Sequence, residues 1–511
     1  MSGSVSFNTI PPNLQVPLFW VETSNAQAGI GTQQQRVLIV GGTLNAMPLA
    51  PVWAPPPAGS GAAGAAQAVA AQAGSGSMLA SMVGHYRLND PFSELWFLPV
   101  ADPSGGAAAT GTTVITGTAT AAGTISDYIG GHLVSCAVSV GQAAATVATN
   151  LAAAANAIST LPVTAAAASG TVTYTTRHKG TSQNQLDHRL NYAGAPAGEA
   201  TPAGLTISVT GFSGASGVPD LSGVAAALGN QEFDFIVSGF NDSTSLAALT
   251  SLMSDTAGRW SYLSQLYGGT FTASIDTATN LLTLGGGRND QHQCIIGAAG
   301  SPTPFWKVAA AVMGVTVPRI IAQPNIPLDG LAVAGVQAPA IGNGFSLSTQ
   351  QSLLTTGISP LTWDRTGTCR ITRLVSTYQT NSYGVPDQSY LDIGTLYTNM
   401  AVLRRLRAGT IARCSQKLLV DDGTPIAAGQ PAVSPRTERI ALYHDYLAMQ
   451  NETLVEDADG FLRDLVVTRN ATNPGRIDVL AAPRIVGGLH IYALLNQFRL
   501  RAGSLQIATA A

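Results

Sequence analysis

An alternation of predicted strands and helices begins at Arg36, stops near Val100 and resumes near Leu221. Buried parallel strands are short apolar runs, and amphipathic helices carry apolar residues three and four positions apart. Segments that follow these patterns are the strand 36–42, the helix 78–86, the strands 94–100, 233–239, 270–275 and 292–297, and the helix 302–313. Such alternation is typical of a sheet with helices on its faces. The sequence therefore predicts one α/β domain in two pieces, residues 36–100 and 218–353.

A further helix of this domain is predicted after the polar run 241–245, whose Asn, Asp, Ser and Thr side chains can cap a helix N-terminus. Apolar residues that would share one face of it are Leu246, Leu249, Met253, Trp260, Leu263 and Tyr267. We therefore expect this helix to continue past residue 260.

The segment that interrupts the α/β pattern, residues 101–217, differs in composition. Thr, Val, Gly and Ala dominate, and Asp102 and Asp127 are the charged residues between positions 101 and 176. Strands with glycine turns are expected at 112–118, 133–140, 170–177 and 205–210, with one helix at about 142–158. Because exposed loops tolerate insertions, we interpret residues 101–217 as a β-rich domain inserted into the α/β domain.

From about Leu354 the composition changes again, with frequent Arg and no Ala between Ala340 and Ala401. We expect a C-terminal α+β domain over 354–495. It would contain a hairpin over 363–375 and helices over 390–412 and 435–450.

Both chain ends are predicted to be extended arms, residues 1–35 and 496–511. Three prolines, Pro11, Pro12 and Pro17, exclude a continuous N-terminal helix. Strand-like apolar residues that we expect to contact other subunits are Val5, Phe7, Ile10, Val16, Leu18 and Trp20 near the start, and Leu494, Phe498 and Leu500 near the end. A lone strand needs a sheet edge, either in its own subunit or in a neighbour.

The chain carries little charge: Lys, Arg, Asp and Glu make up 10% of its 511 residues, against roughly 25% in an average soluble domain. A surface this weakly charged suggests that other subunits cover part of it. Residues 1–354 carry a net charge of −6 and residues 355–511 a net charge of +3. A nucleic-acid-binding protein needs a larger basic excess, so we expect no nucleic-acid partner.

The location that these features predict is a reducing cytoplasm. The four cysteines, at positions 136, 294, 369 and 414, lie far apart and form no disulfide-rich pattern. The N-terminus lacks a basic region followed by an apolar stretch, which would mark a signal peptide. The long uncharged stretch 58–86 consists mainly of Ala, Gly, Ser and Gln, so no membrane insertion is expected.

Motifs for chemistry are weak in this sequence. The strand that ends at Gly42 lacks the glycine pattern of a dinucleotide site, and no phosphate-binding loop with Lys-Ser/Thr occurs. His178 and His188, and the pair His292 and Cys294, do not supply three or four ligands at zinc spacing. No Gly-x-Ser-x-Gly elbow is present. The sequence does not exclude a Ser-His-Asp triad, because the members of such a triad lie far apart along a chain. We therefore predict no catalytic, cofactor-binding or metal-binding residues, no cofactor and no enzyme activity.

A band of basic residues marks the predicted helix 390–412 and its end. It comprises Arg404, Arg405, Arg407 and Arg413, followed by Lys417. One interpretation is an ordinary solvated face. The other is an electrostatic contact with an acidic partner surface, such as that of a neighbouring subunit.

Short motifs spread in order over nearly the whole chain resemble those of phage Mu-type contractile tail sheath proteins. They are Val5-Ser-Phe-Asn-Thr-Ile-Pro, Arg36-Val-Leu-Ile-Val-Gly, Gly76-Ser-Met-Leu-Ala, Asn89-Asp-Pro-Phe-Ser-Glu-Leu-Trp, Arg177-His-Lys-Gly, Thr377-Tyr-Gln-Thr-Asn, Ser389-Tyr-Leu-Asp, Asp421-Asp-Gly-Thr and Gln497-Phe-Arg-Leu. The Ala/Gly/Pro-rich stretch at 53–76 and the tail beyond Leu500 depart from the family pattern.

This resemblance implies a virion structural protein, assembled in the host cytoplasm, whose subunits stack as hexameric rings around a tail tube and contract to drive the tube through a bacterial envelope. It also implies a subtilisin-like fold for the α/β domain, arms that add strands to neighbouring subunits, and contacts with baseplate and tail terminator proteins. The C-terminal domain would then form the inner layer, and residues 101–217 would project outward.

Two other classes of function remain open from the sequence. The β-rich insertion suggests a virion adhesin or receptor-binding module, and a subtilisin-like fold suggests a hydrolase, although a fold alone implies no activity.

Overall fold

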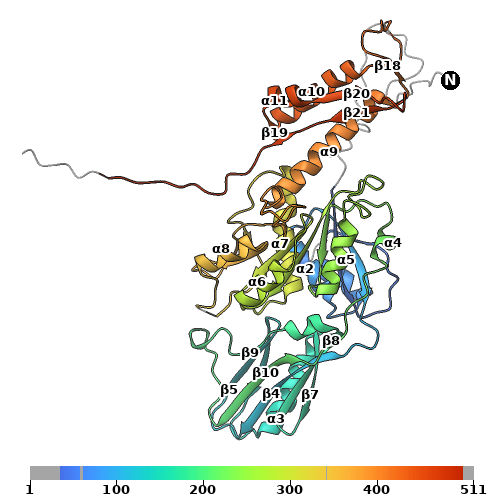
Figure 1. Cartoon of the computed structure of the whole chain (residues 1–511). Coiled ribbons are helices and arrows are strands. Elements are labelled where there is room, and N and C mark those ends of the chain that lie inside the picture. The colour runs from blue at the N-terminus through green and yellow to red at the C-terminus, as the bar shows by residue number, and fades with distance from the viewer. Residues whose placement is uncertain (1–34, 58–60, 341, 428, 499–511) are drawn as a thin grey trace, which may run out of the picture.

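The structure, a computed structural model, describes residues 35–57, 61–340, 342–427 and 429–498. Three bodies follow one another along the molecule in Figure 1. The insert, residues 101–217, lies at one end and the sheet body, built around the largest sheet, lies in the middle. The C-terminal lobe, residues 402–485, lies at the other end. The six expected contact residues of the N-terminal arm, Val5 to Trp20, and Leu500 lie outside the described residues.

The sheet body contains nine strands in the order β14-β16-β15-β13-β12-β11-β1-β3-β2. Their bounds are β1 (Arg36–Thr43), β2 (Val52–Ala54), β3 (Glu94–Ala101), β11 (Phe235–Ser238), β12 (Gly269–Ile275), β13 (Gln293–Ala298), β14 (Ala332–Val333), β15 (Ile358–Trp363) and β16 (Cys369–Ile371). The run from β3 through β1, β11, β12 and β13 to β15 is parallel, and β2 and β16 pair antiparallel at its two ends. The mixed α/β class is thus confirmed.

Helices cover both faces of this sheet. They are α1 (Gly61–Ala73), α2 (Met78–Asn89), α4 (Val224–Leu228), α5 (Ser243–Met253), α6 (Ala278–Gly286), α7 (Phe305–Ala322) and α8 (Leu347–Thr355). Successive strand residues face opposite sides, and β13 shows the division. Its Cys294 and Ile296 belong to the large core that includes α2 and α7, whereas Ile295 packs in a smaller core with Leu281 of α6 and Leu353 of α8.

Two expectations for helices need revision. The helix expected to continue past residue 260 ends at Met253, because the chain turns back at Gly258, where an added Cβ would lie 2.6 Å from the Leu252 carbonyl oxygen. Leu263, which was expected on the inward face, is therefore 77% exposed. The helix expected over 302–313 extends to Ala322. This α7 is apolar and long enough to cross a membrane, but 72% of the stretch is buried inside the protein.

The sheet also continues beyond residue 354, where the C-terminal domain was expected to begin. The predicted hairpin is present as β15 and β16, with Leu361 opposite Ile371 and Trp363 opposite Cys369. Because β15 pairs with β13, this hairpin belongs to the sheet of the central body. Backbone pairing therefore joins the two segments across the expected boundary.

The insert contains two antiparallel sheets and a helix. The bounds are β4 (Ala108–Gly117), β5 (Gly123–Ile129), β6 (His132–Val138), α3 (Ala144–Ala157), β7 (Val163–Ala168), β8 (Thr171–Lys179), β9 (His188–Leu190) and β10 (Leu205–Ser213), with short 3-10 helices at Thr181–Gln185 and Ala195–Ala197. One sheet has the order β10-β4-β8-β7 and the other β6-β5-β9. The β-rich expectation holds, and β5, β7 and β9 are strands that the sequence did not reveal.

A buried ionic network connects the two sheets of the insert. The Nε2 of His188 on β9 lies 3.0 Å from Oδ1 of Asp127 on β5, and both side chains are fully buried. The other sheet supplies Thr113 Oγ1 and Tyr174 OH, which donate to Asp127 Oδ2 over 2.8 and 2.9 Å. The second imidazole nitrogen, Nδ1, lies 3.0 Å from the Thr210 carbonyl oxygen. Since both nitrogens face acceptors, the ring is an imidazolium, and the interactions with Asp127 raise its pKa despite burial.

The insert is also fixed to the sheet body by partly buried polar contacts. Lys307 of α7 donates to Nε2 of His132 on β6 over 2.8 Å, and the Gln337 amide donates to the Gly131 carbonyl oxygen over 2.9 Å. Burial lowers the pKa of Lys307 to about 8, and its charge, with burial, lowers the pKa of His132 to about 3. Near neutrality the pair therefore carries one positive charge, on Lys307, and Nε2 of His132 remains a hydrogen-bond acceptor.

The C-terminal lobe is built from short elements around a small core. They are α9 (Ile393–Cys414), β17 (Leu418–Leu419), β18 (Ala432–Val433), α10 (Pro435–Asn451), β19 (Val455–Glu456), α11 (Ala458–Asp464), β20 (Val466–Arg469), β21 (Ile477–Leu480) and β22 (Arg484–Ile485). The strands form three two-stranded sheets, β17-β18, β19-β22 and β20-β21. The buried residues of this core are Val402, Leu442, Tyr446, Met449, Leu454, Val455, Ala458, Phe461 and Leu465.

Helix α9 joins the lobe to the sheet body. Tyr397 in its first half belongs to the large core, stacks on Phe235 with ring centroids 4.6 Å apart, and donates to the Asp234 carbonyl oxygen over 2.8 Å. Val402, one turn further on, belongs to the lobe core. The helix thus crosses the joint between the two bodies, as Figure 1 shows.

Candidate assembly surface

The usual ligand position of an α/β sheet is filled in this protein. Ligands bind such sheets beyond the carboxyl ends of neighbouring strands where the strand order reverses, here at β1 and β11. His178 of the insert occupies this place: its Nε2 accepts from the Met78 N–H over 2.9 Å, and its Nδ1 lies 2.7 Å from Asp102 Oδ1. A Cβ on Gly42 would approach the ring to 2.9 Å. The remaining cavity of about 10 Å³ has room for about one water molecule.

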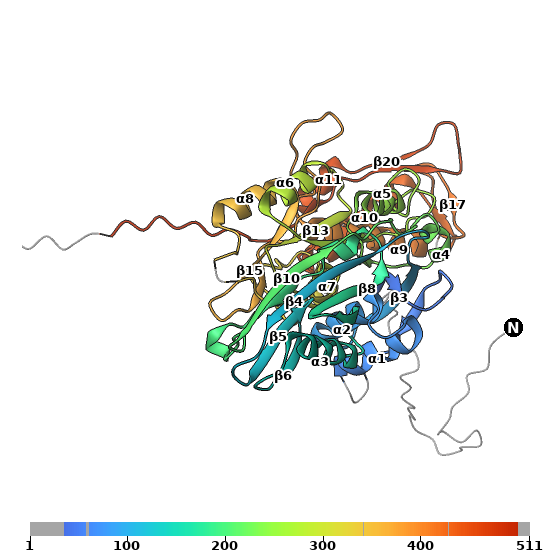
Figure 2. The same cartoon turned by 90° about the horizontal axis from the view of Figure 1, so that it is seen from below.

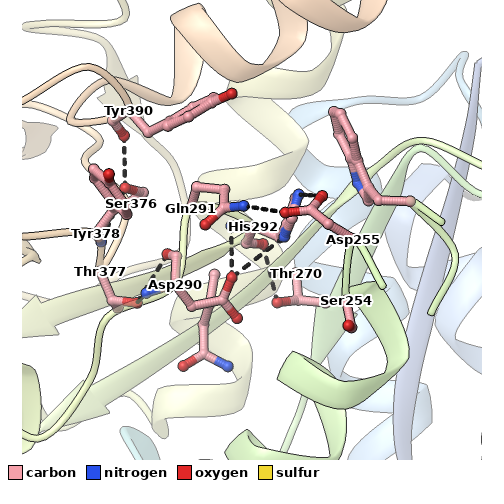
Figure 3. Close-up of polar contacts among 12 residues, drawn as sticks. Ser254, Asp255, Thr270, Asp290, Gln291, His292, Ser376, Thr377, Tyr378 and Tyr390 are labelled. Atoms are coloured by element: carbon pink, nitrogen blue, oxygen red, sulfur yellow. Dashed lines mark hydrogen bonds and ion pairs between the residues drawn. The ribbon is translucent and has the colours of Figure 1, made fainter. Parts of the chain in front are cut away.

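A second polar cluster lies where the chain enters β13, around His292 (Figure 3). The imidazole lies between two carboxylates, with Nδ1 3.3 Å from Asp290 Oδ1 and Nε2 3.5 Å from Asp255 Oδ1. Burial alone would raise the pKa of Asp290, but hydrogen bonds from His292 lower it. Gln291 donates to the other oxygen of Asp255 over 2.6 Å. Within the described residues no hydroxyl or thiol bonds to this ring, so the cluster lacks the nucleophile–base pair of a catalytic triad.

The residues considered for metal binding are separated in the structure. Cys294 points into the large core and lies 3.4 Å from Ser359 Oγ, and burial raises the pKa of its thiol to about 12. His178 and His188 belong to the two separate networks described above. No group of three or more His, Cys, Asp or Glu side chains in the described part of the chain is placed to hold a metal ion.

Three arginines of the predicted basic band bind acidic side chains of their own subunit. Arg404 lies 2.6 Å from Asp234 Oδ1, Arg405 lies 2.7 Å from Glu452 Oε2, and Arg413 contacts Asp445 at 2.6 Å and Glu438 at 3.0 Å. Burial raises the pKa of Asp234, although Arg404 opposes this effect. The sequence did not indicate these pairings, because the acidic partners are distant along the chain or lie on another helix.

Arg407 differs from the other three arginines. It is exposed on α9, and the ion pairs of the basic band in the described part of the chain involve Arg404, Arg405 and Arg413 but not Arg407. It borders a groove of about 260 Å³ with Glu232, Gln265, Arg404, Ala408 and Ile411, and Ile411 is 56% exposed. Of the four candidate charges, Arg407 therefore offers a free guanidinium at the surface. Its partner stays a prediction.

The C-terminal segment, residues 486–498, leaves the molecule after β22. It forms no helix or strand in the described residues, and Figures 1 and 2 both show it running away from the body. Leu494 is 74% exposed and Phe498 is 78% exposed. Their neighbours Ile491, Tyr492 and Leu495 are exposed to a similar extent. These are the two predicted C-terminal contact residues that the structure describes, and neither is buried in its own subunit.

Open sheet edges lie on the C-terminal lobe. Among the residues that the structure describes, each of its sheets has two strands, and the hairpin of β20 and β21 exposes apolar side chains: Val466 is 48% exposed, Val479 46% and Leu480 65%. A two-stranded sheet is marginally stable alone and presents unpaired backbone groups along its edges. The lobe thus offers edges to which an extended strand can add.

Comparison with known proteins gives the family. No family model matches the chain. The Mu-like prophage FluMu tail sheath protein of Haemophilus influenzae is 34% identical over 509 residues, which is 97% of this chain and 100% of that protein. Among solved structures, the chain is similar to the sheath tail proteins of Desulfitobacterium hafniense (10% identical, 92% of this chain and 100% of that chain, TM-score 0.44) and Listeria innocua (10% identical, 88% and 95%, TM-score 0.41).

The whole-length match to the Haemophilus protein places this chain among the structural proteins of contractile phage tails, and so among virion components. More specifically, the chain belongs to the family of Mu-like tail sheath proteins. The resemblance that the sequence motifs indicated is confirmed.

Proposed function

We propose that this subunit polymerises as stacked hexameric rings around a tail tube, and that the sheath contracts to drive the tube through the host envelope. The arms would add strands to sheets of neighbouring subunits, so that subunits remain connected while their bodies move. Baseplate and tail terminator proteins would bind the ends of the sheath. The sheet body would correspond to the subtilisin-like domain of the family, and assembly would take place in the host cytoplasm.

One observation carries this proposal: the C-terminal segment exposes a run of apolar side chains that its own subunit does not bury. Leu494 and Phe498 are each about three-quarters exposed. Burying such side chains against a neighbour would stabilise the assembly by about 1.5–3 kcal/mol each before entropic losses. The open edges of the C-terminal lobe provide acceptors for the backbone of the arm.

The low charge of the chain supports the same proposal, because a subunit that is covered by copies of itself needs little charge for solubility. Energy for contraction would be stored when the sheath assembles, since the sequence lacks a nucleotide-binding loop. The extended lattice would then be less stable than the contracted one. The lobe would lie in the inner layer near the tube, with Arg407 facing the tube or a neighbour, and the insert would lie outside.

Removing either arm tests the proposal. We expect chains that lack residues 1–20, or that end at His490, to be soluble and folded but unable to form helical tubes in negative-stain electron micrographs. A milder variant replaces Leu494 and Phe498 with Ser. Its matched control replaces Tyr262 and Leu263, which are 78% and 77% exposed on a loop of the sheet body, with Ser. Normal tubes from both arm deletions would refute the role of the arms.

A further inference from the structure

Residues 484–490, which comprise β22 and the first residues of the C-terminal segment, cross the joint between the lobe and the sheet body. Ile485 pairs with Val455, and the Val486 N–H donates to the Leu454 carbonyl oxygen over 3.2 Å, so this end is held by the lobe. Two residues later the chain passes close to the sheet body. A Cβ added to Gly488 would lie 2.8 Å from Pro327 Cγ, so this approach requires glycine. One short stretch therefore contacts both bodies.

A histidine closes this crossing. The Nδ1 of His490 lies 2.6 Å from Asp329 Oδ2, its Nε2 contacts Asp392 Oδ2, and its side chain is 12% exposed. Each ring nitrogen thus faces a carboxylate oxygen, and the contact of Nδ1 with Asp329 is a hydrogen bond. Arg373 binds the same Asp392 oxygen over 3.0 Å. The imidazole of His490 and the guanidinium of Arg373 thus converge on two carboxylates, and the hydrogen bond to the Asp329 carboxylate holds the ring in place.

The two carboxylates belong to the parts of the sheet body that form the joint. Asp392 directly precedes α9, the helix that crosses into the lobe. Asp329 lies in the loop that follows α7. In the same loop, the amides of Gln323 and Asn325 donate to Thr453 of the lobe over 3.1 and 2.6 Å. Beyond His490 the next side chain, Ile491, is 77% exposed. His490 therefore makes the last hydrogen bond and ion pair of the segment with its own subunit among the described residues.

We propose that His490 is a positioning residue that fastens the C-terminal segment across this joint, and that it couples the direction of the segment to the angle between lobe and sheet body. A neighbouring subunit that holds the segment would then act on the joint directly, and movement at the joint would re-aim the segment. The proposal rests on the proposed function in one respect, namely that a neighbour holds the segment.

Hydrogen exchange of the full-length, unassembled protein tests the fastening itself. We expect His490→Ala to speed amide exchange about tenfold or more at residues 484–490, because local opening no longer breaks the hydrogen bond to Asp329 and the contact with Asp392. We also expect faster exchange at 452–456 and 323–329, the two sides of the joint. His444→Ala, an exposed histidine on α10, is the matched control and should change none of these. Faster exchange confined to 488–492, or no change, would overturn the proposal.

Two further variants keep the test decisive. Asp329→Asn removes one carboxylate without removing volume, and we expect the same pattern of faster exchange, with unchanged exchange in the insert as evidence of an intact fold. A chain that ends at His490 retains the fastening, so its exchange at 452–456 should match that of the full-length protein. If this truncated chain still polymerised, the proposed role of the arm would fail while the fastening stood. If His490→Ala left exchange unchanged, the fastening would fail while the arm stood.

Discussion

The insert and the C-terminal lobe lie at opposite ends of the sheet body (Figure 1), and they differ in how far their own residues complete their sheets. The insert has two sheets of three and four strands and a packed helix. Its Asp127 and His188 are fully buried, and every oxygen of Asp127 has a donor. The lobe has three two-stranded sheets and apolar side chains in solvent. A region with few charged residues, such as the insert, can therefore complete its sheets with its own strands. A region whose sheets need a further strand is recognised instead by its low number of strands per sheet and by its exposed apolar side chains.

The insert and the lobe also differ in the contacts that join them to the sheet body. The insert is joined by partly buried contacts such as that of the buried Lys307 with His132, and its His178 fills the space beyond β1. The lobe is joined by the crossing helix α9, whose Arg404 pairs with the buried Asp234, by the segment that ends at His490, and by contacts at the surface, such as Asn325 with Thr453. Movement within the subunit is thus expected at the joint to the lobe rather than at the joint to the insert.

Among the substitutions that test this difference between the insert and the lobe, we expect Asp127→Ala to have the largest effect on stability. Removing the carboxylate leaves the imidazolium of His188 buried without a counter-charge and leaves Thr113 and Tyr174 without their acceptor. Loss of one partner of a buried ion pair costs about 3–5 kcal/mol. We expect exchange of insert amides to become much faster while exchange in the lobe is unchanged. Asp220→Asn, at an exposed carboxylate, is the control. A stable insert without Asp127 would contradict the role of this network.

A somewhat smaller effect is expected from Phe461→Ala in the lobe. Phe461 stacks on Tyr446 with centroids 3.9 Å apart, and both belong to the small core of the lobe. Truncating a buried Phe costs about 3–5 kcal/mol, and less where the site can collapse, so we expect about 3 kcal/mol here. Exchange should rise throughout residues 434–485 and stay unchanged in the insert. Protection that persisted in the lobe would show that its core extends beyond these residues.

The sequence predicted the parts of this molecule whose pattern is local. The strands at β1, β3 and β11–β13 are apolar runs bounded by turn residues, and α10 begins at a capping Ser434. Contacts between distant segments could not be predicted in this way: Asp329 and His490 are 161 residues apart. Strands of two or three residues, such as β14 and β22, are too short to show a period. The helix expected past residue 260 had the right apolar spacing, but α5 ends at Met253, and at Gly258 the chain folds back against the last turn of this helix.

For the assembly surface, the sequence indicated the arms because extended apolar segments with prolines have no place in a compact fold. It did not separate the four arginines of the basic band. Arg404 and Arg407 lie on the same helix, yet the structure gives Arg404 a buried acidic partner and leaves Arg407 exposed. Charge runs read from sequence therefore overestimate the charge that is free to bind a partner.

The pH dependence of the insert gives a third, smaller effect. The pKa of His188 in the folded protein is raised above its usual value of 6.5 by Asp127. Its protonation stabilises the folded insert fully below pH 6.5, and this stabilisation is lost as the pH rises through the folded pKa. Stability of the insert should therefore fall above pH 6.5 by at most about 1.4 kcal/mol per pH unit. Protection of insert amides, corrected for intrinsic exchange, measures this. The lobe core has no such buried histidine, and a parallel decline there would argue against His188 as the cause.

The smallest effect on stability should come from a charge reversal at Arg407. Because this side chain is exposed and has no described ion pair, Arg407→Glu should change the free energy of unfolding by no more than about 0.5 kcal/mol. Asn150→Glu, on the exposed face of α3 in the insert, should be equally neutral for stability. The two substitutions differ in assembly: if the lobe faces the tube or a neighbour, Arg407→Glu slows tube formation, most strongly at low salt, whereas Asn150→Glu does not. Equal rates at every ionic strength, followed by light scattering, would make Arg407 an ordinary solvated residue and leave the exposed apolar segment as the feature that sets the lobe apart from the insert.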